Sequence, residues 1–331
     1  MEIQKVPIRK AVTVPLAASL LVFLAPLAHA VPTINAEVQY NVGTISGTDQ
    51  DGPLTASSGG VDVLAQQQDG YYNNVFYHTY GTAGGNFGSR VSGGGEFDIT
   101  GVFTYSDTLV NTTSATQQYI FEFDVVAGEL AASGYNLAAG EFVQASYNID
   151  ISIDTGAGLY TVWSSSAAVQ MTDAGGTLSE GGNLLDGATL TSDGSSGYIH
   201  YDWDNTMRNV FLGEFASGSS FDFVYTLSAS ASSNFNPFTE SSCEPKDFGE
   251  GAGFDFGEVF IDFVETDPRC IGNSAIARSG DPFYFNNFGY NPHTLTISQR
   301  AVSTGNVPEP ASIALLGLGI VGLVGARRRK S

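Results

Sequence analysis

Two aspartates that lie close together in the first part of the chain could hold a metal ion. Asp49-Gln50-Asp51-Gly52 places two carboxylates two residues apart, before a glycine that favours a turn. Carboxylate oxygens are the hard ligands that calcium prefers, although the pattern lacks the bidentate glutamate of a complete EF-hand loop. Acidic turns of this kind are also common without a metal. Calcium at Asp49 and Asp51 and a plain turn both stay open, and no other cofactor is expected.

A second pattern combines imidazole with carboxylates. The segment from Tyr198 to Asp204 alternates, so that His200, Asp202 and Asp204 fall on one face of an expected strand. Imidazole and carboxylate together suit zinc or manganese. The solvent-facing side of a strand gives the same pattern, and we favour that interpretation. His78 lies among tyrosines and is expected to be an ordinary packed or surface histidine.

No catalytic constellation is recognisable in the sequence. It contains no Gly-x-Ser-x-Gly elbow, no P-loop and no His-Glu-x-x-His pattern. Acidic residues are too numerous to single out a pair for glycoside hydrolysis. Aromatic residues crowd the segment 235–290, where a glycan-binding surface is one hypothesis and core filling is the other. No catalytic residues are therefore predicted.

The last 25 residues have a distinct organisation. Pro308, Glu309 and Pro310 precede an apolar stretch, residues 311–326, and the chain then reaches the basic cluster Arg327, Arg328, Arg329 and Lys330. As a helix this stretch would be about 24 Å long at about 1.5 Å per residue, slightly less than the roughly 30 Å of a bilayer core. We expect a short transmembrane helix with its basic end in the cytoplasm, and a buried core helix is the alternative.

Those three parts, in that order, resemble the PEP-CTERM sorting domain. Pro308, Glu309 and Pro310 match the motif, and residues 327–330 match its basic end. The resemblance covers about 25 of the 331 residues. It implies that an exosortase recognises the motif and removes the anchor, in an exopolysaccharide-producing Gram-negative bacterium. The motif residues would then be recognition residues of a substrate.

The N-terminus indicates the same export route. Lys5, Arg9 and Lys10 precede an apolar run, and Ala28-His29-Ala30 supplies small residues at the alternate positions that signal peptidase requires. We predict a signal peptide over residues 1–30 with a helical apolar region, cleaved after Ala30. An uncleaved anchor is the alternative.

Composition restricts the partners of the segment between these signals. Residues 31–307 contain six Lys and Arg residues against 32 Asp and Glu residues, a net charge of −26. This charge repels nucleic acid and anionic lipid, so neither is an expected partner of the core. Solubility of an exported protein is the simplest reason for it.

Alternating short segments indicate a mainly β core. Segments with this pattern are 97–100 and 102–105 around a glycine, 119–126, 148–154, 159–163, 198–203, 221–227 and 259–264. Glycine-rich turns separate them. We predict one acidic antiparallel β-sandwich of jelly-roll type over residues 31–302, with a long loop over 236–257 and a linker over 303–307 before the sorting tail, 308–331. A β-solenoid is the alternative, but no fixed repeat is present.

Cys243 and Cys270 are the only two cysteines. In an oxidising compartment an isolated pair favours a disulfide, and two free thiols are the alternative.

Taken together, the sequence predicts an exported surface or extracellular-matrix protein, anchored briefly in the cytoplasmic membrane. Its expected partners are signal peptidase, an exosortase and, through the setting of the tail, exopolysaccharide. The core is expected to be structural or binding and not enzymatic. The alternative is a secreted carbohydrate-active enzyme or glycan-binding module on the same tail.

Overall fold

The computed structural model describes residues 28–29, 31–55, 59–70, 73–82, 87–235, 273–279 and 295–302. These residues form strands and their connections, and no helix long and apolar enough to cross a membrane occurs among them. The predicted signal helix, the long loop, the linker and the transmembrane helix lie outside this range. The prediction of a mainly β, antiparallel sandwich is confirmed.

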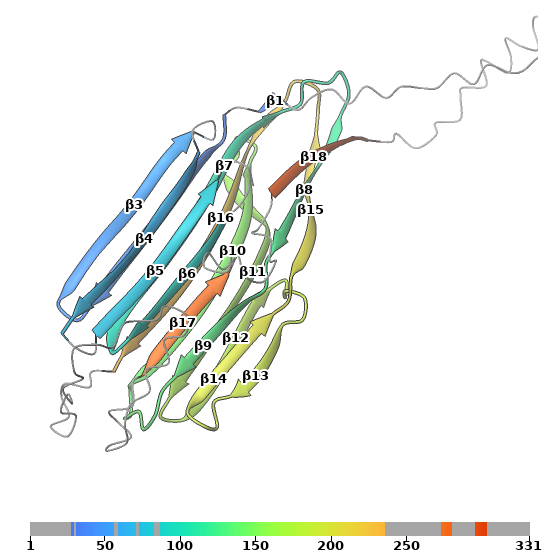
Figure 1. The fold of residues 1–331 in the computed structure, drawn as a ribbon. Coiled ribbons are helices and arrows are strands. Elements are labelled where there is room, and N and C mark those ends of the chain that lie inside the picture. The colour runs from blue at the N-terminus through green and yellow to red at the C-terminus, as the bar shows by residue number, and fades with distance from the viewer. Residues whose placement is uncertain are drawn as a thin grey trace, which may run out of the picture.

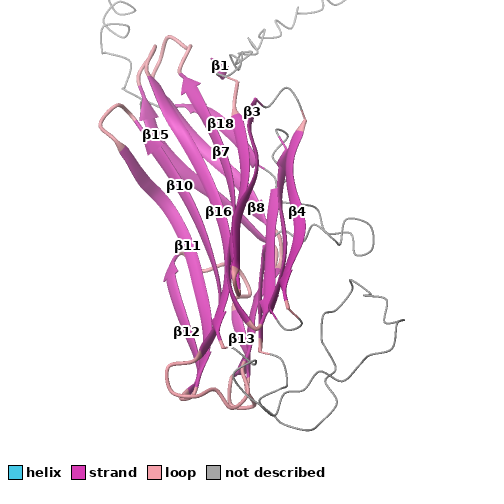
Figure 2. Cartoon of the chain, turned by 90° about the vertical axis from the view of Figure 1, so that its left-hand side faces the viewer, coloured by secondary structure: helices cyan, strands magenta, loops and turns pink. Residues whose placement is uncertain are grey.

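Two large sheets form the body of the sandwich (Figure 1). Sheet A has the spatial order β12 (Gly175–Gly182), β11 (Leu159–Thr172), β10 (Phe142–Asp154), β16 (Ser220–Asn234), β7 (Glu96–Val110), β2 (Thr33–Val42) and β3 (Ile45–Thr55), and β1 (Ala28–His29) also pairs with β7. Sheet B has the order β13 (Thr189–Asp193), β14 (Tyr198–Trp203), β9 (Gly128–Ser133), β17 (Ser274–Ser279), β6 (Phe87–Gly94), β5 (Asn73–Thr82) and β4 (Gly60–Asp69). Figure 2 shows the strands of sheet A as one layer.

A third, smaller sheet completes the layer opposite sheet A. Sheet C contains β15 (Thr206–Phe215), β8 (Gln117–Val125) and β18 (Leu295–Ala301). Strand β8 continues into β9, and β14 continues into β15, each through two residues. Sheets B and C therefore follow one another along the same layer, and sheet C covers the end of sheet A toward which β7 runs (Figure 1).

Strict alternation explains why these segments are strands with one buried face. In β10, Ile149, Ile151 and Ile153 are fully buried, while Asp150 and Asp154 lie on the other face. The period of two places successive side chains on opposite faces, so a slip of one residue would bury the carboxylates. The prediction of which face these isoleucines occupy is confirmed.

Aromatic rings fill the space between the layers. Phe87 of sheet B stacks on Phe103 of sheet A with ring centroids 4.9 Å apart, and Phe121 of sheet C contacts Phe223 of sheet A at 4.7 Å. Gly81 lies against the Phe103 ring, where an added Cβ would overlap it. The core therefore depends on a small residue at this position to admit a large one from the facing sheet.

Within the described residues, the strand predictions were correct in position and mostly too short. Tyr198–Trp203 has the predicted bounds, whereas the segments 97–100 and 102–105 are parts of the continuous strand β7. The five strands between residues 33 and 94 were not predicted. Predicted strand 259–264 and loop 236–257 lie outside the described residues.

Candidate functional site

Most of the predicted processing sites lie outside the described residues. These are Pro308, Glu309 and Pro310 of the sorting motif, the basic end 327–330, Ala30 of the cleavage site, and the cysteines Cys243 and Cys270. The disulfide and the cleavage stay predictions. Ala28 lies in β1, where it pairs with Val110 at the end of β7.

Asp49 and Asp51 lie within a strand and make contacts with protein groups. Tyr77 donates a hydrogen bond from its hydroxyl to Asp49, and the backbone N–H of Asp62 donates to Asp51 Oδ2 at 2.8 Å. The expected turn at Gly52 is wrong: β3 continues to residue 55, and the pairing of β2 and β3 shifts register near this glycine, as at a β-bulge. The two carboxylates thus connect the neighbouring edges of sheets A and B, and calcium binding there stays a prediction.

His200 and Asp202 share the outer face of β14, while Asp204 follows the end of the strand. His200 Nδ1 lies 3.6 Å from Asp202 Oδ2, and its Nε2 lies 3.2 Å from Glu129 Oε2 on the neighbouring strand β9. The Asp204 N–H donates to the Asp186 carbonyl at 2.8 Å. Among the described residues no group of three or more His, Cys, Asp or Glu side chains could hold a metal ion.

Charged side chains form a transverse row on the outer face of sheet B. Asp202, Glu129, Arg278, Arg90 and His78 are successive register partners on β14, β9, β17, β6 and β5. Register partners lie on the same face of a sheet, so these five side chains are neighbours. We call them the charged row. It gathers two of the six basic residues of the 31–307 segment.

Glu129 lies at the centre of the contacts in the charged row. Arg278 Nε donates to Glu129 Oε1 at 3.0 Å, and His200 lies against the other carboxylate oxygen. Burial by itself would raise the pKa of Glu129, but the hydrogen bond to His200 and the charges of Arg278 and Arg90 outweigh it and lower the pKa. The row thus stabilises an ionised carboxylate in a partly buried setting.

His78, on β5, lies at the far end of the charged row. Its Nε2 lies 2.8 Å from Asp62 Oδ1 on β4, and its side chain is 12% exposed. Arg90, beside it, lies over the ring of Phe76, with its guanidinium carbon 5.5 Å from the ring centroid. The expectation of a packed histidine agrees with this position, and the contact between His78 and Asp62 is an addition that the sequence did not reveal.

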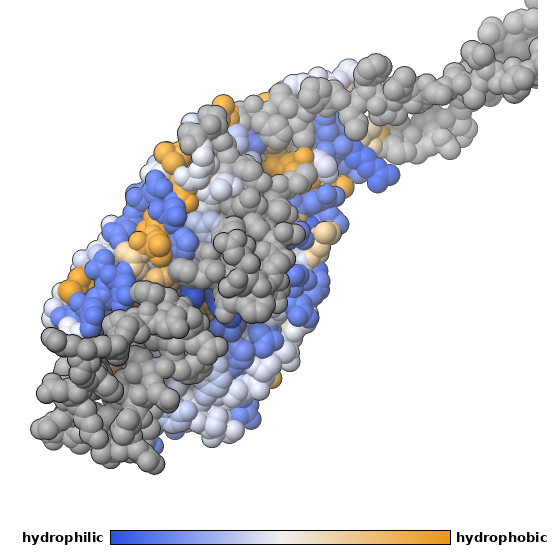
Figure 3. Space-filling view, in the orientation of Figure 1, coloured by the Kyte–Doolittle hydropathy of each residue, from blue (hydrophilic) through white to orange (hydrophobic). Residues whose placement is uncertain are grey.

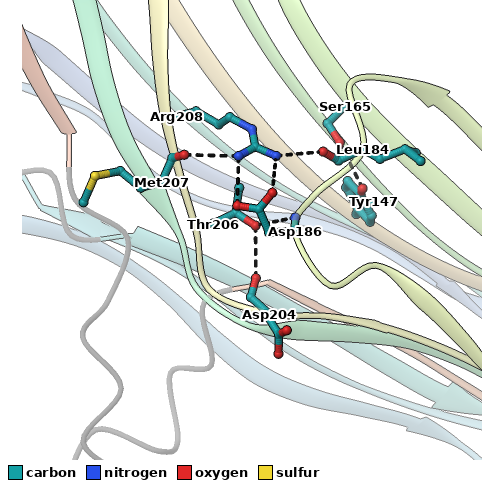
Figure 4. A network of polar contacts seen from close by, with 8 residues as sticks. All are labelled: Tyr147, Ser165, Leu184, Asp186, Asp204, Thr206, Met207 and Arg208. Carbon is teal, nitrogen blue, oxygen red and sulfur yellow. Dashed lines mark hydrogen bonds and ion pairs between the residues drawn. The ribbon is translucent and has the colours of Figure 1, made fainter.

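A second polar network fastens the loop between β12 and β13 (Figure 4). Arg208 on β15 forms two hydrogen bonds with the Asp186 carboxylate, at 2.9 and 2.8 Å, and a third with the Leu184 carbonyl at 3.0 Å. The Asp186 N–H donates to Thr206 Oγ1 at 2.7 Å. The arginine fork matches carboxylate geometry, so this network positions the loop against sheet C.

The outer face of sheet A has a different character. Two adjacent rows of register partners cross all seven strands from β12 to β3 and consist almost entirely of small or uncharged polar side chains. The first row is Ser179, Ala168, Ser146, Ser230, Thr100, Gln39 and Thr48. The second row is Thr177, Gln170, Gln144, Ser232, Asp98, Asn41 and Ser46. Thirteen of these fourteen side chains are uncharged. We call these two rows the polar face. Other rows of the same outer face carry Glu37, Asp150, Asp154 and Asp222, so the low charge is a property of these two rows.

A shallow depression lies at one side of the polar face. It has a volume of about 380 Å³, and Gln39, Asn41, Asp98 and Thr100 are among its lining residues. A second depression of about 240 Å³ adjoins it and shares Asn41 and Asp98. Amide, hydroxyl and carboxylate groups at these positions offer both hydrogen-bond donors and acceptors. This arrangement can bind a polar, uncharged or weakly charged ligand.

The sequence did not reveal the charged row or the polar face as sites. Glu129, Arg278 and Arg90 are far apart in the sequence, and only the order of strands in sheet B makes them neighbours. The core has only six basic residues, and this scarcity could have singled out Arg90 and Arg278 as residues with a specific role. Phe235, from the proposed aromatic surface, is 1% exposed and belongs to the core; the other aromatic residues of 236–272 and 280–290 lie outside the described residues.

The fold and the tail define an exported β-sandwich protein with a C-terminal sorting signal. Residues 306–330 match the family model of the PEP-CTERM protein-sorting motif. The chain is therefore an exported protein that is anchored transiently in the membrane and processed by an exosortase. A comparison with curated proteins found no match.

Proposed function

We propose that this protein is a non-enzymatic component of the cell surface or extracellular matrix, and that its sandwich binds polysaccharide along the polar face. The sorting motif supports the route to the surface. The observation that carries the binding function is the polar face itself, in which hydroxyl and amide groups recur across seven hydrogen-bonded strands.

The physical properties of the polar face suit a polyhydroxyl polymer. Serine, threonine, asparagine and glutamine can each donate and accept hydrogen bonds, as sugar hydroxyls do. Short hydroxyl side chains lose less conformational entropy on binding than long charged ones. Neighbouring strands are about 4.8 Å apart, so the groups form a regular array that an extended chain can follow. Some contacts within the array already exist, such as Thr100 Oγ1 to Ser230 Oγ at 2.9 Å.

Binding to immobilised exopolysaccharide from the producing bacterium tests this function. The chain truncated before Pro308 should be retained, and the double variant Gln39→Ala/Asn41→Ala should be retained several-fold less. The matched control is Gln66→Ala/Gln68→Ala, which removes two exposed amides with the same spacing from the outer face of sheet B. No retention at any of several salt concentrations, or equal loss in both double variants, contradicts the proposal.

A further inference from the structure

Both ends of the described core meet at one end of the sandwich. Strand β1 pairs with the end of β7, and β18 ends at Ala301, beside the start of β8. Figures 1 and 2 both show β1 and β18 at the same end, opposite the β13–β14 turn. The loops 111–116 and 216–219 lie at this end as well. We call these two loops and the end of β18 the terminal end.

The terminal end is a hydrogen-bonded unit. Asn111 is 1% exposed and joins the two loops: its side-chain amide donates to the carbonyls of Ala115 and Phe215, and its carbonyl accepts from the Gly218 N–H at 2.8 Å. The Val302 N–H donates to the Thr116 carbonyl at 3.3 Å. The point at which the chain leaves the sandwich toward the sorting motif is therefore fixed to these loops.

Charge differs between the two ends of the sandwich. The terminal loops have the sequences Asn-Thr-Thr-Ser-Ala-Thr and Ala-Ser-Gly-Ser and carry no charged residue. Two exposed carboxylates, Glu214 and Asp222, lie in the strands beside these loops, whereas the opposite end carries Asp69, Glu96, Glu141 and Asp193 at or beside its turns. An anionic membrane surface repels carboxylates within about one Debye length, roughly 8–10 Å. The terminal end is thus the end that can approach such a surface at the lower electrostatic cost.

The length of the linker restricts the geometry further. Residues 303–307 separate the described core from the sorting motif, and five residues span at most about 18 Å. Strand β7 has 15 residues, which corresponds to about 50 Å at about 3.4 Å per residue. A linker of about 18 Å cannot span the roughly 50 Å length of the sandwich. The sandwich therefore cannot stand on its opposite end while the tail lies in the membrane.

We propose that, while the tail anchors the protein, the sandwich stands on the bilayer on its terminal end, with loops 111–116 and 216–219 against the phospholipid headgroups. This inference rests on the anchoring by the sorting tail and not on polysaccharide binding. In this orientation the polar face of sheet A is perpendicular to the membrane and open to ligand before the exosortase releases the protein.

Cysteine labelling in spheroplasts of a host without exosortase tests the orientation. Ser114→Cys places a thiol on an exposed position of the terminal end, and Ser196→Cys places one on an exposed position of the opposite end. A polymer-linked maleimide should label Ser114→Cys several-fold more slowly than Ser196→Cys, because the headgroups obstruct the bulky reagent. The parent chain, with Cys243 and Cys270, gives the background.

The same two variants ending at Val302 provide the control for intrinsic reactivity. Released from the membrane, they should react at similar rates. Equal rates in the anchored chains, or slower labelling of Ser196→Cys, overturns the proposal. The absence of exosortase excludes that enzyme as the cause of protection. Neither Ser114 nor Ser196 belongs to the polar face, so the outcome is independent of the binding test.

Discussion

Arg208 and Asp186 form a two-pronged ion pair in which both guanidinium Nη atoms donate to the carboxylate, at 2.9 and 2.8 Å. The pair connects β15 to the loop between β12 and β13, and the same guanidinium holds the Leu184 carbonyl. The Arg208 side chain thus makes three of the hydrogen bonds that hold a loop whose sequence, Gly-Asn-Leu-Leu-Asp-Gly, has little secondary structure of its own.

Replacing Arg208 by alanine should release this loop while leaving the sandwich folded. Amide hydrogen exchange at Asp186 should accelerate, because its N–H hydrogen bond to Thr206 depends on the position of the loop. Arg208→Lys is the control: it keeps the charge but not the planar fork, so we expect intermediate protection. Unchanged exchange in Arg208→Ala would show that the ion pair does not position the loop.

Gly81→Ala should destabilise the core. The added Cβ would overlap the ring of Phe103, and overpacking of a dense core costs about 1–3 kcal/mol. Denaturant unfolding of the tail-less chain measures the change. Gly181→Ala is the matched control on an outer strand, because its Cβ would meet only the Ser166 hydroxyl, which can rotate away. Equal effects of the two substitutions would argue against the close approach of Gly81 and Phe103.

Two buried tyrosines should respond in opposite ways to loss of the hydroxyl. Tyr225 is fully buried, burial raises its pKa well above the ordinary value, and its Oη has no hydrogen-bond partner in the described part of the chain. Tyr225→Phe should be neutral or slightly stabilising, since it removes a desolvated polar group. Tyr147 shares a 3.0 Å hydrogen bond with buried Ser165, so Tyr147→Phe should cost about 1–3 kcal/mol.

The free energies of unfolding of Tyr225→Phe and Tyr147→Phe, measured against the wild type, test both expectations. A large loss of stability in Tyr225→Phe would mean that its hydroxyl has a partner after all.

Glu129 should make the stability of the sandwich depend on acid pH. Its pKa is lower in the folded protein than its ordinary value of 4.5. The carboxylate therefore contributes stability that is complete above 4.5 and is lost as the pH falls through the lower folded value. The difference in unfolding free energy between the wild type and Glu129→Gln should be largest at neutral pH and shrink in acid. Glu122→Gln, at an exposed position of β8, controls for the loss of one charge, and an identical pH profile in both variants would contradict this role.

Removal of the chain from Pro308 onward should change the location of the protein and not its fold. The described strands end at Ala301, so the truncated chain should unfold at the same denaturant concentration as the released wild type. Fractionation of the host should find the full chain transiently with the membrane and the truncated chain in the soluble exported fraction. If both forms end in the same fraction at the same mass, the sorting interpretation fails.

The sequence alone determined the route and the kind of fold. The sorting motif is a contiguous signal, and the alternation of Ile149, Ile151 and Ile153 with acidic residues is local, so both can be read directly from neighbouring positions. Strands whose pattern is interrupted by glycine, such as β6 with its Gly88, Gly93 and Gly94, escaped prediction because small residues carry little hydrophobic pattern.

The tertiary structure decided which distant residues became neighbours. Arg90, Glu129 and Arg278 form one row only because β17 inserts between β6 and β9, and Gln39 and Ser230 share the polar face only through β7. Strand order depends on packing between sheets over long separations in the chain, and no local pattern encodes it. For the same reason the sequence named the sorting tail, whereas only the structure revealed from which end of the sandwich that tail leaves.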